Sequence, residues 1–360
     1  MQNEINKAVL NALDECRSID GRQVGELEKS LAEYVGVKHC VSCANGTDAI
    51  FLMLSAWGIG SGDAVFVPDF TFFATAEAVA RTGAVPVFCD VQKDTFNVDV
   101  QSLENAVQKV KNSGKLNAKA VVAVDMFGLP ANYPELSVIA QKHDLLLFQD
   151  SAQGFGGEIN GRLNGSFGNA AAVSFFPSKP LGCYGDGGAV FTNDTQKADI
   201  MRSLKCHGKG KDKYENVRVG INSRLDTVQA AILQVKFKAF KNSELAALRM
   251  AAEFYSKQLC EKWNIPVIPQ DFKSSWAQYT IRFDNKSKRD MVQKSLAKMG
   301  IPTMIYYPKP LSKQQAFKKF EKFADCPNSE ILCQTVLSLP IHPYITNDEI
   351  AKVADIINKF

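Results

Sequence analysis

The sequence predicts an α/β protein with a mostly parallel central sheet, helices on both faces of that sheet, and a smaller α+β domain at the C-terminal end. Short apolar runs alternate with helical patterns through the first two thirds of the chain. This alternation is typical of crossover connections between parallel strands. The apolar runs show no polar alternation, as expected of strands buried on both faces. After about residue 225 the pattern changes to long helical stripes and shorter strands.

Composition excludes several classes of protein. The chain has 360 residues, of which 46% are hydrophobic and 22% charged, which fits two globular domains or one large one. No stretch reaches the roughly 18–20 uncharged apolar residues of a membrane helix, and we expect no membrane partner. The net charge of +4 is small and argues against nucleic acid as a partner. Nine cysteines and no visible signal peptide predict free thiols in the cytoplasm.

The expected elements of the first part follow one another in a regular order. Apolar runs predict strands over residues 39–43, 64–67, 85–89, 120–124, 145–148, 171–175 and 188–191. Helical spacing of apolar residues predicts helices over residues 24–35, 46–54, 71–82, 99–111 and 132–142. Strands and helices in this order build a doubly covered sheet, and ligands of such sheets bind beyond the carboxyl ends of the strands.

The second part begins with a helical stripe over 228–239. Helices are then expected over 245–262, 287–298 and 346–357, and strands over 278–283 and 304–306. The last helix opens with a capping box, in which Thr346 and Glu349 occupy the first and fourth positions. We expect a boundary near residue 240, with a large α/β domain over 1–240 and a small α+β domain over 241–360.

Three weaker patterns are interpreted as structural. Cys40 and Cys43 lie in an apolar run and predict a buried strand rather than a zinc site. Glycines at 58, 60 and 62 precede a strand rather than follow one, so they predict a turn and disfavour a nicotinamide oxidoreductase. A basic cluster is interpreted as a solvated loop rather than an anion contact; it consists of Lys205, Lys209, Lys211 and Lys213.

Two polar residues lie a few positions after the ends of predicted strands. Lys179 lies between Pro177 and Pro180. It fits either a desolvated lysine with a lowered pKa, available as a nucleophile, or an ordinary exposed loop lysine. Asp150 ends an apolar run and fits either a helix cap or the carboxylate that pairs with the protonated ring nitrogen of pyridoxal phosphate.

Two further segments are candidates for binding anions. Asn45, Gly46 and Thr47 join a strand to a helix, where backbone N–H groups favour a phosphate, and Ser174 offers a hydroxyl donor. Simple helix capping explains the same residues equally well. Arg224 precedes a long helix and fits either a bidentate clamp for phosphate or carboxylate, or a structural salt bridge.

Together these segments resemble the sugar-nucleotide aminotransferases of the DegT/DnrJ/EryC1/StrS family, which are fold-type I pyridoxal phosphate enzymes. The resemblance extends over almost the whole chain. The segments that carry it are residues 42–49, 71–76, 150–153, 174–188, 222–226 and 307–311.

The resemblance implies a role for each matching residue near the cofactor ring. Lys179 resembles the lysine that forms a Schiff base with the cofactor. Asp150 resembles the partner of the pyridine nitrogen. Gln153 matches the residue near the phenolic oxygen, and Phe72 matches the aromatic residue that stacks on the ring.

The resemblance also implies a phosphate site and a homodimer. Gly46, Thr47 and Ser174 match phosphate contacts within one chain. Asn222 matches a phosphate contact that the family supplies from the neighbouring subunit. A homodimer with shared active sites is therefore expected.

Within the family, residues 174–194, 218–233 and 338–344 are most similar to WbpE-like enzymes. These transfer an amino group from L-glutamate to C3 of a UDP-2-acetamido-3-keto-hexuronic acid for surface polysaccharide. Their counterpart of Arg224 contacts the sugar carboxylate. Tyr306 and Tyr307 are expected to bind substrate, although Tyr306 replaces a frequent histidine and carries no positive charge at neutral pH.

Beside a nucleotide-binding α/β oxidoreductase, which the glycine spacing disfavours, two alternatives to this expectation remain. In the first, the acceptor is a UDP- or dTDP-linked 3- or 4-keto-6-deoxy sugar, which needs no carboxylate clamp. In the second, the protein binds the cofactor as a sensor and has no turnover.

Overall fold

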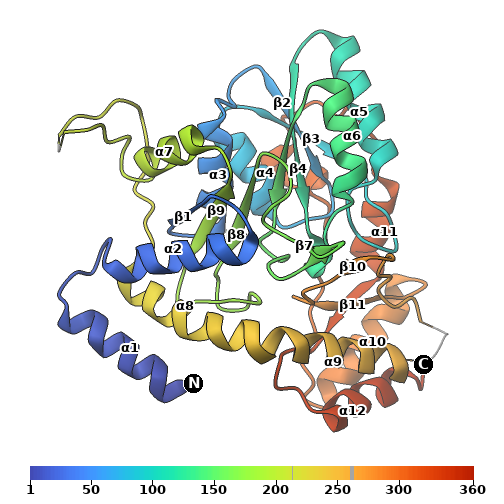
Figure 1. The fold of residues 1–360 in the computed structure, drawn as a ribbon. Coiled ribbons are helices and arrows are strands. Elements are labelled where there is room, and N and C mark those ends of the chain that lie inside the picture. The colour runs from blue at the N-terminus through green and yellow to red at the C-terminus, as the bar shows by residue number, and fades with distance from the viewer. Residues whose placement is uncertain (213, 260–262) are drawn as a thin grey trace.

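The computed structural model describes residues 1–212, 214–259 and 263–360, and it has the predicted α/β class (Figure 1). Its central sheet has seven strands. Their spatial order is β1 (His39–Cys43), β9 (Gly188–Thr192), β8 (Ala170–Ser174), β5 (Leu146–Asp150), β4 (Asn117–Val124), β2 (Asp63–Pro68) and β3 (Val85–Cys89). The strands from β8 to β3 pair in parallel, and β9 runs antiparallel to both of its neighbours. The prediction of a mostly parallel sheet is confirmed.

The strands carry apolar side chains on both faces of this sheet, and helices therefore cover both faces. On one face, Val65, Val122 and Phe148 pack against a first group of helices. This group is α3 (Gly46–Ala56), α4 (Phe73–Arg81) and α7 (Thr195–Leu204). On the other face, Phe66 and Val173 contact a second group. This group is α2 (Arg22–Val35), α5 (Val100–Ser113), α6 (Tyr133–His143) and α8 (Thr227–Ala239).

The C-terminal part has its own apolar cluster around the antiparallel pair β11 (Tyr279–Arg282) and β12 (Val336–Leu339). The helices of this part are α9 (Leu245–Gln258), α10 (Lys286–Lys298), α11 (Pro327–Thr335) and α12 (Asn347–Ile357). The capping box of Thr346 and Glu349 is present at α12.

A segment of the C-terminal part returns to the central sheet. Leu311 and Phe317 join the apolar cluster under α3 and α4, and Phe323 joins the cluster under α5 and α6. The predicted boundary at residue 240 falls on a π-helical turn, Phe240–Glu244, which links α8 to α9. The division into domains 1–240 and 241–360 stays a proposal.

Several elements differ from the sequence expectations. The strand expected over 304–306 is a single bridge between Met304 and Ser338 on the edge of β12 opposite β11, and the chain then continues to Leu311, which bonds to Asp69 at the end of β2. The helix expected over 245–262 ends at Gln258, and residues 260–262 lie outside the described residues. The sequence reading missed α1 (Gln2–Asp14), α7, α11, β12 and a small sheet formed by β10 (Phe272–Lys273), β6 (Glu158–Ile159) and β7 (Arg162–Leu163). Short 3-10 turns lie at Met126–Gly128, Leu311–Lys313 and Gln315–Phe317.

The prediction that Lys205 belongs to a solvated loop is wrong. Its side chain is buried, and Nζ donates a hydrogen bond to the carbonyl oxygen of Ser42 at 2.7 Å, with Glu28 at 3.7 Å. Lys209 and Lys211 are exposed as predicted, whereas Lys213 is not among the described residues. Apolar packing of α7 carries Lys205 under β1, and a buried ammonium requires such partners.

The sequence predicts neither a metal site nor a membrane-spanning helix. Within the described part of the chain, no group of three or more metal-ligating side chains is found, and Cys40 and Cys43 lie in the buried strand β1. No helix of the described residues is long and apolar enough to cross a membrane.

Candidate active site

A pocket lies at the carboxyl edge of the central sheet, where the polar residues singled out in the sequence come together. Asp150 ends β5 and Ser174 ends β8, and these two strands are neighbours. The cavity has a volume of about 590 Å³, a size typical of small-molecule sites. The predicted residues that line it are Gly46, Thr47, Phe72, Asp150, Gln153, Ser174, Lys179, Tyr306 and Tyr307.

Lys179 projects into this pocket from a turn between β8 and β9. The turn is closed by a hydrogen bond from the backbone N–H of Lys179 to the carbonyl oxygen of Phe176, at 2.8 Å. Burial lowers the pKa of the Lys179 amine, and attraction to the carboxylate of Asp150 opposes this shift. Of the two interpretations of Lys179, the geometry fits the desolvated lysine rather than the exposed one.

Asp150 is held as a buried carboxylate, 4% exposed. Burial raises its pKa, whereas hydrogen bonds from Thr75 and from the backbone of Ala152 favour the charged form and lower it. Thr75 Oγ1 donates to Asp150 Oδ2 at 2.8 Å, and the Ala152 N–H donates to Oδ1 at 3.2 Å. Thr75 lies on α4, and its contact with Asp150 joins residues 75 positions apart, so no local pattern in segment 71–76 indicates it.

Aromatic side chains form one wall of the pocket. The rings of Phe72 and Tyr307 lie 6.0 Å apart, and those of Tyr306 and Tyr307 lie 5.5 Å apart. Gln153 donates from Nε2 to the hydroxyl of Tyr307 at 3.2 Å and accepts from the backbone N–H of Phe127 at 2.8 Å. Gln153 therefore couples the wall to the loop after β4.

Close packing shapes the end of the pocket at the first turn of α3. A Cβ atom on Gly46 would lie 2.7 Å from Cβ of Ser174, and one on Gly188 would lie 2.5 Å from the backbone of Asn45. Asn45 accepts a hydrogen bond from the backbone N–H of Asp48 at 2.8 Å and caps the helix. The capping role and an open anion site at Gly46 and Thr47 are therefore compatible.

Two predicted site residues lie outside the pocket. Asn222 is exposed and pairs with Cys206 through a backbone bridge, and Arg224 is half-buried. Between them, Ser223 accepts a hydrogen bond from the backbone N–H of Ala44 at 3.0 Å. The segment is thus attached beside β1, but its two functional candidates do not line the cavity of their own chain.

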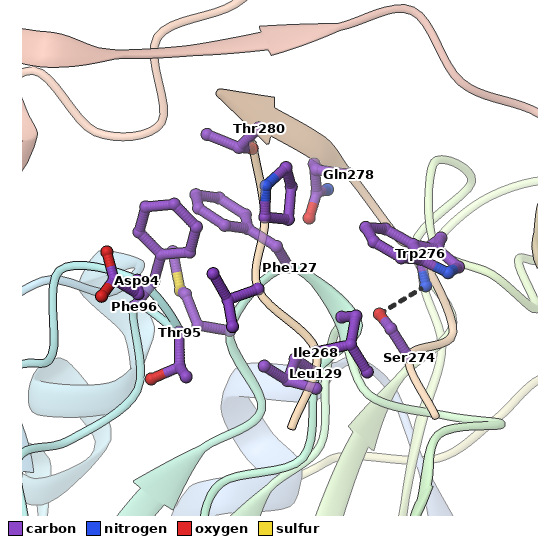
Figure 2. A pocket seen from close by; sticks show the side chains of 13 residues that line it. Asp94, Thr95, Phe96, Phe127, Leu129, Ile268, Ser274, Trp276, Gln278 and Thr280 are labelled. Atoms are coloured by element: carbon purple, nitrogen blue, oxygen red, sulfur yellow. Dashed lines mark hydrogen bonds between the residues drawn. The ribbon is translucent and has the colours of Figure 1, made fainter. Parts of the chain in front are cut away.

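The pocket also contains residues that the sequence analysis did not assign. These are Asp48, Glu77, Arg81, Asp186 and Gln278. The first three lie on α3 and α4, two helices that the sequence predicts from the spacing of their apolar residues alone. Gln278 also lines a neighbouring cavity of about 10 Å³, roughly the space of one water molecule. Figure 2 shows that rings such as Phe127 and Trp276 surround this smaller space.

Comparison with known proteins identifies the family. Residues 1–358 match the DegT/DnrJ/EryC1/StrS aminotransferase family. The chain belongs to this family. Its members are pyridoxal phosphate-dependent transaminases, so the predicted family, fold type and enzyme class are confirmed. The roles of individual site residues stay predictions.

Relatives in the family act on nucleotide sugars. UDP-2-acetamido-2-deoxy-3-oxo-D-glucuronate aminotransferase of Pseudomonas aeruginosa is 41% identical over 345 residues, covering 96% of this chain and 92% of the relative. UDP-N-acetyl-3-dehydro-alpha-D-glucosamine 3-aminotransferase of Acidithiobacillus ferrooxidans is 39% identical and covers 100% of this chain and 94% of the relative. The crystal structure of a family aminotransferase from Brucella abortus has a TM-score of 0.97 at 46% identity, covering 100% of this chain and 95% of that one.

A buried network lies beneath the turn that presents Asp150 in this aminotransferase. Asp125 is fully buried and accepts hydrogen bonds from the Tyr133 hydroxyl at 2.7 Å and from Gln149 Nε2 at 2.8 Å. Its backbone N–H donates to the carbonyl oxygen of Asp150 at 3.0 Å. A Cβ atom on Gly154 would lie 2.4 Å from Asp125 Oδ2, so the turn and the carboxyl group are in close contact.

The Asp125 carboxyl group makes stability depend on pH. Burial raises its pKa from a usual value of 3.8 to about 7. The folded state therefore binds the proton more tightly than the unfolded state does. The contribution of Asp125 to the free energy of unfolding is full below about pH 4 and is lost as the pH rises to about 7.

The Asp125 carboxyl group is expected to lower the free energy of unfolding as the pH rises from about 4 to about 7. We expect the Asp125→Asn substitution to remove this pH-dependent loss. Urea unfolding between pH 4 and pH 8 measures it, with Asp199→Asn as an exposed control. The free energy of unfolding of the wild type should fall relative to Asp125→Asn across this range, by an amount on the order of a few kcal/mol. Parallel curves for the two proteins would contradict the assignment.

Proposed function

We propose that this protein binds pyridoxal phosphate in the pocket and transfers an amino group from L-glutamate to a nucleotide-linked keto sugar. The proposed acceptor carbon is C3 of a UDP-2-acetamido-3-keto-hexuronic acid, and the product serves surface polysaccharide or glycan synthesis. One observation carries the proposal: Lys179 and Asp150 line the same pocket, together with Phe72 and the first turn of α3.

The residues present fit pyridoxal phosphate. Gly46 and Gly188 allow the first turn of α3 to pack closely against Ser174 and the start of β9, because a Cβ atom at either position would clash. This packing places the backbone N–H groups of that turn and the Ser174 hydroxyl at one end of the pocket, as a phosphate site at a helix N-terminus requires. Lys179 would hold the aldehyde carbon, Asp150 the ring nitrogen, and Phe72 the ring face. When bound, the cofactor supplies an electron sink for the carbon that loses a proton.

Lys179 and Asp150 would then divide the proton chemistry between them. A lowered pKa gives Lys179 more neutral amine, so Nζ can accept the proton that leaves Cα of glutamate. In the second half-reaction the same Nζ delivers a proton to the sugar carbon that receives the amino group. Hydrogen bonds from Thr75 and Ala152 favour the charged form of Asp150, which would pair with a protonated ring nitrogen at the opposite end of the site.

The choice of a uronate acceptor is supported by the named activity of the P. aeruginosa relative, which is 41% identical. Among the described residues that line the pocket, the basic side chains are Lys179 and Arg81, and Tyr306 is neutral. A sugar carboxylate near Tyr306 therefore needs a cation from elsewhere. We assign this role to the partner subunit's Arg224.

The positions of Asn222 and Arg224 also support a homodimer with shared sites. Asn222 and Arg224 do not line the pocket of their own chain, although the family resemblance gives both a ligand contact. In a two-fold symmetric dimer one segment can enter the partner's pocket while its counterpart enters the first.

An uncharged acceptor is the second candidate. Tyr306 can donate a hydrogen bond to a sugar oxygen but cannot neutralise a carboxylate. This observation favours a nucleotide-linked 3- or 4-keto sugar, such as a 6-deoxy sugar, which carries no charge at C6.

Replacing Lys179 tests the proposed chemistry. Lys179→Ala should lower turnover by roughly 10³-fold, because the general base is lost, and should abolish the visible absorbance of lysine-bound cofactor. Lys209→Ala, which alters an exposed lysine, should leave both unchanged. Glutamate consumption and cofactor absorbance are measured together. A Lys179→Ala enzyme with wild-type turnover would refute the proposal, and a wild-type protein that binds cofactor without converting it would indicate a sensor.

Mixed dimers test the shared sites. A Lys179→Ala chain and an Asn222→Ala/Arg224→Ala chain, each with its own affinity tag, are coexpressed, and the heterodimer is purified through both tags. Shared sites place both defects in one pocket and leave the other intact, so about half of the wild-type activity should return. Activity no higher than that of the two parent homodimers would show that each site belongs to one chain.

Substitution of Arg224 tests the acceptor. Arg224→Ala should reduce kcat/KM for the uronate acceptor by roughly 10²-fold, because loss of a charge-assisted pair leaves the carboxylate uncompensated. Uncharged 6-deoxy acceptors should change by less than about threefold. Mass spectrometry of UDP- and dTDP-keto sugars incubated with glutamate gives the comparison. An equal loss for both acceptor types would favour the uncharged acceptor.

A further inference from the structure

A carboxylate lies at the phosphate end of the proposed cofactor site. Asp48 belongs to the first turn of α3 and lines the pocket together with Gly46 and Thr47. Its side chain is 15% exposed, so solvent screens it only in part. A helix N-terminus stabilises an acidic side chain, but a phosphate at the same N-terminus would be repelled by that charge.

A charge of opposite sign comes from the neighbouring helix. Arg81, the last residue of α4, places Nη1 3.1 Å from Asp48 Oδ1. The guanidinium carbon lies 4.7 Å from the centre of the Phe51 ring, so an aromatic face of α3 also holds the group in place. Helices α3 and α4 pack against each other, as Figure 1 shows, and Arg81 itself lines the pocket.

The remaining charges of the pocket do not replace Arg81. In the described part of the pocket lining, the acidic residues are Asp48, Glu77, Asp150 and Asp186, and the basic residues are Arg81 and Lys179. Lys179 is attracted to Asp150 and is assigned to the aldehyde end. Arg81 is therefore the cation that compensates the acidic side chains on α3 and α4.

We propose that Arg81 is a positioning residue that neutralises Asp48 and so keeps the first turn of α3 available to the cofactor phosphate. The inference rests on the proposed binding of pyridoxal phosphate. The proposal predicts different effects on phosphate binding for the loss of each residue. Loss of Arg81 exposes the phosphate to an uncompensated carboxylate, whereas loss of the Asp48 charge does not weaken phosphate binding.

Pyridoxamine phosphate is the probe for this effect. Its amine cannot bond covalently to Lys179, so its dissociation constant reports the non-covalent hold on the phosphate. Calorimetry at low salt is applied to the wild type, Arg81→Met, Asp48→Asn and the double variant. Methionine preserves packing over Phe51. Arg202→Met is the matched control, because Arg202 is also 40% exposed and pairs with Asp199 at 3.3 Å outside the pocket.

Arg81→Met should raise the dissociation constant by about threefold to tenfold, and the effect should shrink at high salt. Asp48→Asn and the double variant should bind within about twofold of the wild type, and Arg81→Lys should retain most of the affinity. Pyridoxamine without a phosphate should bind equally weakly to all variants. Arg202→Met should bind as the wild type does.

Three results would overturn the proposal. They are an Arg81→Met enzyme with wild-type affinity, a double variant as weak as Arg81→Met, and an equal loss for pyridoxamine. The second result would make Arg81 a direct or structural contact. A wild-type protein that does not bind pyridoxamine phosphate would instead refute the proposed function, so the two failures are distinguishable.

Discussion

Attraction between the Lys179 amine and the Asp150 carboxylate, which line one pocket at the carboxyl edge of the sheet, is the interaction on which the proposed chemistry depends. Burial disfavours both charged forms, and each charge partly offsets the penalty on the other. Strand pairing brings them together: β5 ends at Asp150, its neighbour β8 ends at Ser174, and Lys179 follows five residues later. The parallel register of β5 and β8 therefore fixes the geometry of the pair.

Glycine residues and a buried carboxyl group pack closely around these strand ends. Gly46, Gly154 and Gly188 each lie where a Cβ atom would meet backbone or side-chain atoms at less than 3 Å. Asp125 contacts the turn that follows Asp150, and burial raises its pKa although the hydrogen bonds that it accepts, such as that from Tyr133, lower it. The edge of the sheet is thus closely packed, as expected of a site that must orient reacting atoms.

The aromatic wall has a different origin. Tyr306 and Tyr307 come from the C-terminal part, and a buried carboxylate fastens their segment to the end of β2. Asp69 accepts from the backbone N–H of Ser312 at 2.6 Å and from its hydroxyl at 2.9 Å. The carbonyl oxygen of Asp69 accepts from the N–H of Leu311 at 2.9 Å. Contacts across more than 240 residues of sequence thus complete a pocket that the first part of the chain only begins.

The sequence by itself predicted the seven strands of the central sheet, most of the helices between them, and the carboxyl edge of the sheet as the place where Lys179, Asp150 and the α3 turn meet. Apolar periodicity and parallel topology are local or nearly local properties, so they can be read along the chain. Only the tertiary structure decided that Lys205 is buried and that β11 pairs with β12. It also decided that Thr75 contacts Asp150 and that Arg81 contacts Asp48. These contacts join distant segments through packing, and packing overrides local preference wherever the energy of burial is larger.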